Sequence, residues 1–122
     1  MIVILTVAPE ITIPPNGITV DNGSEAILNC TIVGDPVPSI SWFVVGGVNL
    51  SLLFSNNVTI PFNEQGRIDS SLITNTVLNR TSMFSSMRLP QTAPFIAGEY
   101  ECRGSNNVGT INRNATIIVH GK

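Results

Sequence analysis

Few residues of this sequence could carry out acid–base, nucleophilic or metal chemistry. The only histidine, His120, lies next to the C-terminus, and we expect it to be solvated. A metal site needs several converging ligands, which one histidine and two cysteines cannot supply. The carboxylates are scattered, and the sequence contains no Asp-rich calcium loop, nucleophile elbow or phosphate loop. We therefore expect no catalytic residue, no metal, no cofactor and no enzymatic activity.

The residues around Cys102 predict two strands joined by a tight turn. Tyr100 and Cys102 are two positions apart, so both point to the same face of an extended strand. Segment 106–109, Asn-Asn-Val-Gly, has the chemistry of a turn. After the turn, apolar residues recur at odd positions: Ile111, Ala115, Ile117 and Val119. This alternation is typical of a half-buried strand.

Two longer motifs around the cysteines resemble a known family. A tryptophan follows Cys30 by twelve positions, and a Tyr-x-Cys lies far downstream, which resembles the immunoglobulin fold. Segment 34–42, Gly-Asp-Pro-Val-Pro-Ser-Ile-Ser-Trp, is similar to the Gly-x-Pro-x-Pro-x-Ile-x-Trp of the I-set branch. Segment 98–109 is similar to the Gly-x-Tyr-x-Cys-x-Ala-x-Asn-x-x-Gly of that branch, with Gly104 at the alanine position.

The resemblance implies a fold class, a bridge and a core. It implies an all-β, immunoglobulin-like Greek-key β-sandwich of two antiparallel sheets, joined by one disulfide between Cys30 and Cys102. Its buried core residues would include Trp42, Tyr100 and Leu28. We expect two strands on either side of the loop that contains Pro36 and Pro38. Their inward side chains would be Ala26, Leu28, Cys30 and Ile32 before the loop, and Ile40, Trp42 and Val44 after it.

The chain of 122 residues is long enough for one domain with its own core. We expect an immunoglobulin-like, I-set-like domain over residues 8–120 and a short tail over 121–122. Residues 1–7 resemble the last strand of the chain, so they are either the tail of a preceding module or a short N-terminal arm.

Between the recognisable motifs, turn residues and prolines predict further elements. Pro14-Pro15 should break an edge strand that runs over 11–20, and segment 21–24, Asp-Asn-Gly-Ser, predicts a hairpin turn. Strands are expected over 71–79 and 83–89, around a turn at 79–82.

The sequence departs from the I-set pattern in two places. Cys30 and Cys102 are 72 positions apart, which is longer than usual, and the added length falls in the middle of the chain. That region could hold extra strands, one of them through Leu50, Leu52 and Phe54. Ile96 occupies the place, four residues before the tyrosine, where the family commonly has an aspartate, so any ion pair of that aspartate is missing.

The compartment depends on the two cysteines and the asparagines. The cysteines could be free thiols, as in a cytosolic muscle-type scaffold, or a bridge formed in an oxidising compartment. Six Asn-x-Ser/Thr triplets occur, whereas about two are expected by chance. These glycosylation candidates are Asn22, Asn29, Asn49, Asn57, Asn79 and Asn114. None falls at an inward position, so we expect an extracellular protein, either secreted or part of a cell-surface ectodomain.

Protein binding is the function that the resemblance implies. Net charge is −2 with no basic run, which argues against nucleic acid or an anionic membrane surface, and no apolar run could span a bilayer. Strand parity predicts an outward face that includes Phe43, Val45, Glu101, Arg103 and Asn112. We expect a homophilic or heterophilic protein contact through Phe43, or the enlarged middle segment covering it.

Three roles stay open beside that of an adhesion or recognition module. The chain could be one bead of a signalling receptor's ectodomain, or a spacer that contacts neighbouring immunoglobulin modules in a tandem array. The third, a cytosolic muscle-type scaffold, would leave the six acceptors unmodified and both thiols free.

Overall fold

Alternating apolar residues build the strands at the centre of the fold. The computed structural model describes residues 6–48 and 60–121. Its strands are β1 Val7–Ile13, β2 Ile18–Asp21, β3 Ala26–Asp35, β4 Ser39–Gly46, β5 Ile73–Asn79, β6 Ser82–Leu89, β7 Gly98–Ser105 and β8 Thr110–His120. Two short 3₁₀ helices, η1 Ser70–Leu72 and η2 Pro94–Ile96, precede β5 and β7.

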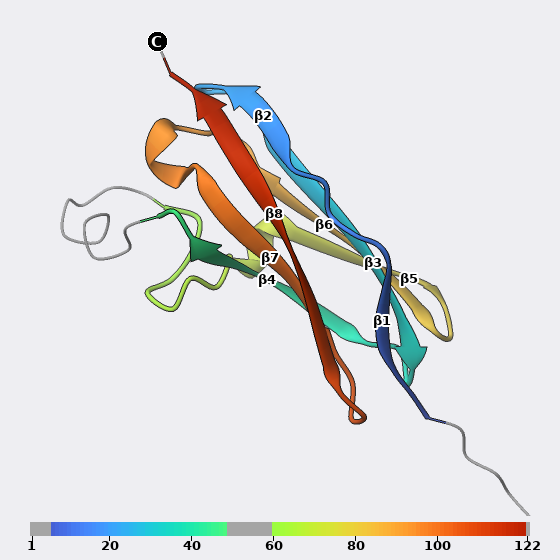
Figure 1. The fold of residues 1–122 in the computed structure, drawn as a ribbon. Helices are drawn as coiled ribbons and strands as arrows, with labels where there is room; N and C mark the ends of the chain where they lie inside the picture. Colours follow the sequence, from blue (N-terminus) through green and yellow to red (C-terminus); the bar gives the residue numbers. More distant parts are fainter. Residues whose placement is uncertain (1–5, 49–59, 122) are drawn as a thin grey trace, which may run out of the picture.

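The strands form two four-stranded sheets packed face to face (Figure 1). One sheet has the order β1-β3-β6-β5 and the other β2-β8-β7-β4. Neighbouring strands are antiparallel except β2 and β8, which run parallel. The fold is therefore the expected immunoglobulin-like sandwich, with one parallel pair at an edge.

The core lies between the sheets and contains the side chains that strand parity placed there. Trp42, Tyr100, Cys30 and Cys102 are fully buried. The remaining inward positions of β3 and β4 are also buried: Ala26, Leu28, Ile32, Ile40 and Val44. The disulfide between Cys30 and Cys102 joins β3 to β7 across this core, with the two Cα atoms 6.5 Å apart.

The first strand is divided between the two sheets. β1 pairs with β3, whereas β2 pairs with β8, and Pro14-Pro15 lies between them. Proline cannot donate to a strand ladder, so this pair ends β1 and frees the chain to cross to the opposite sheet. β1 begins at Val7, the last residue of the segment that was expected to be either an N-terminal arm or the tail of a preceding module.

The turn at 21–24 is not the hairpin turn that its chemistry predicted. It reverses the chain, with the Ser24 amide donating to the Asp21 carbonyl at 2.9 Å and Gly23 at a φ of 89°. However, β2 and β3, which it connects, lie in different sheets. Turn residues dictate that the chain reverses but not which strand it then joins.

The middle of the chain supplies a small hairpin over 62–68 that covers the outer edge of β4. The Val44 amide donates to the Gly66 carbonyl at 2.7 Å, and the Ile68 amide donates to the Trp42 carbonyl at 2.9 Å. Asn63 closes the hairpin, because its Oδ1 accepts from the amides of Gln65 and Arg67. The strand expected through Leu50, Leu52 and Phe54 lies outside the described residues.

Candidate functional site

A charged and aromatic cluster lies on the outer face of the β2-β8-β7-β4 sheet. We call it the Phe43 patch and define it as Phe43 of β4, Glu101 and Arg103 of β7, and Arg67 of the 62–68 hairpin. The register places Phe43 directly across from Glu101 and also in a bridge with Arg67. Cross-strand neighbours of this kind have Cβ atoms about 5 Å apart, so their side chains meet.

Two guanidinium groups lie over the Phe43 ring. The Arg103 Cζ is 3.9 Å from the ring centroid, and the Arg67 Cζ is 5.6 Å from it. Both distances are within the roughly 6 Å over which a cation is attracted to an aromatic face. The ring, expected either to be an exposed apolar anchor or to be covered by the enlarged middle segment, is half-buried, and Arg67 of that segment and Arg103 lie over it.

Glu101 holds Arg103 in this position. The Arg103 Nε and Nη2 donate to the Glu101 Oε1 at 2.7 and 2.6 Å. Glu101, which was expected on an outward face, is only 7% exposed. The parity argument correctly gave the face, but Arg103 covers the carboxylate, and Phe43 and Asn114 flank it on the neighbouring strands.

The other residues expected on this face lie around the patch. Val45 is 44% exposed near the end of β4, and Asn112 of β8 is the register partner of Arg103. Glu99 is exposed on β7, where its Oε2 accepts from Asn114 Nδ2 at 2.9 Å. The structure therefore brings Phe43, Glu101 and Arg103 together and leaves Val45 and Asn112 at the margin.

Arg67 is the member of the patch that sequence reasoning missed. It follows Asn63-Glu64-Gln65-Gly66, whose Asn-x-x-Gly spacing is the same as that of the turn at 106–109. Gly66 has a φ of 85°, a left-handed conformation that glycine adopts without strain. The Asn-x-x-Gly spacing could have predicted the hairpin, which places Arg67 at the edge of β4.

The two largest core side chains have buried polar partners. The Trp42 indole Nε1 donates to the Ser85 Oγ at 2.8 Å, and the Tyr100 hydroxyl donates to the Ile96 carbonyl at 2.6 Å. Burial raises the pKa of the Tyr100 phenol above its usual range. Ile96, at the position where the family commonly has an aspartate, is buried, so apolar packing replaces an ion pair there.

Asn106 is a second residue whose role the sequence did not reveal. Its Nδ2 donates to the carbonyls of Val7 and Pro36, both at 2.9 Å, while its Oδ1 accepts from the amides of Val108 and Gly109. One side chain therefore ties the β7–β8 turn to the start of β1 and to the loop between β3 and β4.

The glycosylation candidates that the structure describes are all at the surface. Asn22, Asn29, Asn79 and Asn114 are exposed, on turns or outward strand positions. The Asn79 Oδ1 accepts from the Thr81 amide at 2.9 Å and from the Thr81 hydroxyl at 3.1 Å. Asn49 and Asn57 lie outside the described residues.

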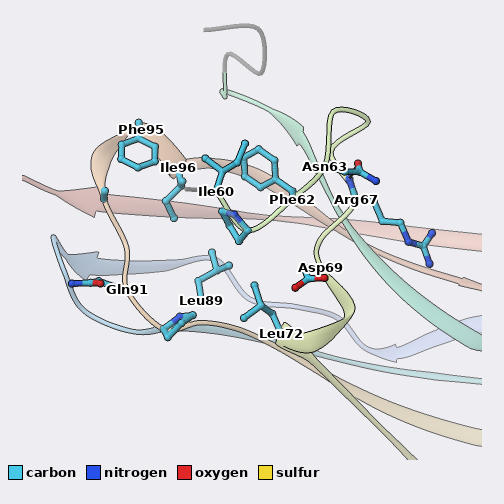
Figure 2. Close-up of a pocket in the computed structure, with 13 residues that line it drawn as sticks. Ile60, Phe62, Asn63, Arg67, Asp69, Leu72, Leu89, Gln91, Phe95 and Ile96 are labelled. Carbon is cyan, nitrogen blue, oxygen red and sulfur yellow. Dashed lines mark hydrogen bonds between the residues drawn. The ribbon is translucent and has the colours of Figure 1, made fainter. Parts of the chain in front are cut away.

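One hollow of about 630 Å³ opens at the end of the sandwich near η2. Figure 2 shows its lining, with Phe95 and Ile96 on one side, Leu72 and Leu89 on another, and Ile60 and Phe62 on a third. The Arg67 guanidinium points away from this hollow (Figure 2). It is a mainly apolar space beside the core, and its polar residues, among them Asn63, Asp69 and Gln91, do not form a catalytic arrangement.

Within residues 6–48 and 60–121, no three histidine, cysteine or acidic side chains gather where a metal ion could be held. In the same residues, no helix is long and apolar enough to cross a membrane.

Comparison with known proteins agrees with this fold. Human protein sidekick-1 is 30% identical to the chain over 118 residues, which is 95% of this chain but 4% of that protein. Mouse hemicentin-2 is 26% identical over 98% of this chain and 2% of its own length. Bovine neural cell adhesion molecule 1 is 30% identical over 91% of this chain and 12% of its own length. The chain thus spans a small part of each of these relatives.

Solved structures share the fold at lower identity. A chimeric titin Z1Z2 superposes with a TM-score of 0.70 at 21% identity, covering 97% of this chain and 100% of that one. The tandem Ig repeats of Dlar superpose with a TM-score of 0.66 at 24% identity, covering 95% of this chain and 50% of that one. The family model for the immunoglobulin domain matches residues 8–106. Its match spans most of the chain, and the chain belongs to the immunoglobulin domain family.

Proposed function

We propose that this immunoglobulin domain is a non-catalytic adhesion or recognition module of a secreted or cell-surface glycoprotein, and that it acts by protein contact. One of its relatives is named a neural cell adhesion molecule. Immunoglobulin domains share a scaffold and differ in surface detail, so the surface has to carry the argument for binding.

The observation that carries the proposal is the Phe43 patch. Binding surfaces are enriched in aromatic residues and arginine, and the patch places one ring and two guanidiniums on one face of a sheet. Glu101 and the strand register hold these groups in place before any partner arrives, which lowers the entropic cost of binding.

The exposed acceptor asparagines support an extracellular location. Four of them lie on the described surface, and charged residues make up only 11% of the chain. Glycans at Asn22, Asn29 and Asn79, away from the Phe43 patch, would supply the solubility that charge does not, whereas a glycan on Asn114, the register partner of Glu101, would crowd the patch. The disulfide is consistent with this location because such bridges form and persist in oxidising compartments.

Beads coated with the domain, secreted by cultured mammalian cells, test the proposal. Aggregation of the beads reports a homophilic contact, and attachment to a panel of cell lines reports a heterophilic one. Phe43→Ser should abolish whichever contact is observed. Leu78→Ser is the matched control, because Leu78 is 55% exposed on β5 of the opposite sheet and should be dispensable.

Two outcomes would contradict the proposal: equal binding by Phe43→Ser beads, or wild-type beads that neither aggregate nor attach to any cell line. Mass spectrometry of the same secreted protein would map the sugars. Six unmodified acceptors together with two free thiols would instead favour the muscle-type scaffold.

A spacer in a tandem array is the second candidate, favoured by the positions of the strand ends. β1 begins at one pole, where Asn106 holds the Val7 carbonyl, and β8 ends at the opposite pole (Figure 1). Modules joined through such ends add their lengths. In that case Phe43→Ser would have no effect on function. Insertion of a second copy of the domain into the array would preserve function and make the array longer.

A further inference from the structure

The Phe43 patch carries more positive than negative charge. Arg67 and Arg103 both lie against the ring, and Glu101 is the one carboxylate among the four residues of the patch. Glu99 points out of the same face, but it lies four residues from Arg103 along β7, about 13 Å away. Its Oε2 accepts from Asn114. Among the described residues, Arg67 makes no ion pair.

Arg103 has hydrogen-bond donors to spare. A guanidinium carries five N–H groups, and Arg103 uses its Nε and Nη2 on a single oxygen, Glu101 Oε1. The Arg103 side chain remains 40% exposed. Its plane is fixed by the ring beneath it and the carboxylate beside it, so a ligand that used the remaining donors would immobilise little further side-chain freedom.

We propose that the patch binds an aspartate or glutamate side chain of a partner protein, with its carboxylate received by Arg103 and Arg67 over the Phe43 ring. A guanidinium offers paired donors that match a carboxylate, and both groups here lie within 6 Å of one ring centroid. A second copy of this chain would present an identical patch with the same excess positive charge. The inference rests on the proposed function, because it names the chemistry of the partner at that same face.

Peptide titration followed by NMR tests the inference on the folded, oxidised domain. The probes are acetyl-tetraglutamate amide and acetyl-tetraglutamine amide, which differ in charge but little in size. At low salt, the tetraglutamate peptide should shift the Nε–H resonances of Arg103 and Arg67, and the tetraglutamine peptide should leave them in place.

The variants separate the patch from charge in general. Arg103→Lys keeps a cation beside Glu101 but loses the planar fork, and it should weaken tetraglutamate binding about tenfold or more. Arg67→Gln should also weaken binding. Arg88→Lys is the matched control, since Arg88 of β6 lies in the opposite sheet, is paired with Glu25 and makes no cation–π contact among the described residues, and it should bind like the parent.

Several results would overturn the inference. They are equal binding of both peptides, an affinity of Arg103→Lys for tetraglutamate within twofold of that of the parent, and a loss of tetraglutamate affinity in Arg88→Lys as large as that in Arg103→Lys. A heparin tetrasaccharide that binds in an Arg103-dependent way while tetraglutamate does not would reassign the patch to sulfate. Bead binding that is lost in Phe43→Ser but retained in Arg103→Lys would leave the adhesion proposal standing and remove the carboxylate inference alone.

Discussion

At the scale of single residues, hydrogen bonds of buried groups decide which side chains tolerate change. The Ser85 hydroxyl, fully buried, accepts the Trp42 indole N–H at 2.8 Å. Ser85→Ala keeps the strand but leaves this donor without a partner in the dry core. We expect the free energy of unfolding to fall by about 1–3 kcal/mol, measured by urea denaturation. Ser86→Ala, one position along β6 and less buried, should change it by under about 0.5 kcal/mol, and equal losses would contradict the argument.

Tyr100, the only tyrosine, gives the domain a pH dependence in alkali. Burial raises the pKa of its phenol in the folded state, whereas in the unfolded chain it titrates near pH 10. The folded state therefore retains the proton that the unfolded state loses. Stability is unaffected below that pH and decreases above it, by up to about 1.4 kcal/mol per pH unit.

Unfolding in urea between pH 8 and 11.5 measures this slope. Tyr100→Phe lacks the titrating group and should give a flat profile, although it is less stable at neutral pH because the bond to the Ile96 carbonyl is lost. A parent protein whose stability does not change between pH 10 and 11.5 would refute the prediction.

At the scale of the elements, the strands were predictable because parity along one strand is a local property. The alternation in β3, β4 and β8 correctly predicted which side chains face inward. The cover over Glu101 was not predictable, because it depends on how Arg103 stacks on a ring from another strand. The 62–68 hairpin was missed because its two buried apolar side chains, Phe62 and Ile68, show no alternation along a strand and are paired with each other across a turn.

Gly104 in β7 gives a test of packing between the two sheets. Immunoglobulin domains of this kind commonly have alanine at its position, but here a Cβ would collide with the Ile32 Cδ1 of β3. Gly104→Ala alone should destabilise the domain by about 1–3 kcal/mol through overpacking. Ile32→Val alone removes the colliding methyl group and should cost about 0.5–1.5 kcal/mol through the small cavity it leaves.

The double variant should then be more stable than the sum of the two single losses indicates, with a favourable coupling of about 1 kcal/mol or more. Urea unfolding of the four proteins completes the cycle. Additive losses would mean that the alanine methyl group at position 104 finds space elsewhere and that Ile32 does not determine which residue occupies this position.

At the scale of the whole molecule, one covalent bridge provides a large part of the stability. The Cys30–Cys102 disulfide closes a loop with a sequence separation of 72, and loops of that length stabilise by about 4–5 kcal/mol in the chain-entropy model. The net stability of a domain is about 5–15 kcal/mol, so the bridge contributes a substantial fraction of the total. The sulfur atoms also pack in the core beside Trp42, which adds to what is lost with them.

Replacing both cysteines, Cys30→Ala with Cys102→Ala, should therefore leave little stable fold at 37 °C, and reduction of the parent by dithiothreitol should do the same. Thermal unfolding followed by circular dichroism measures both, and Ser39→Ala, at an exposed position of β4, serves as the control. A cooperative transition within about 10 °C of the parent would contradict the prediction, because a loss of this size lowers Tm by more than that. A reduced protein that stayed folded would also weaken the extracellular proposal, since the domain could then function in a reducing compartment, where such bridges are rare.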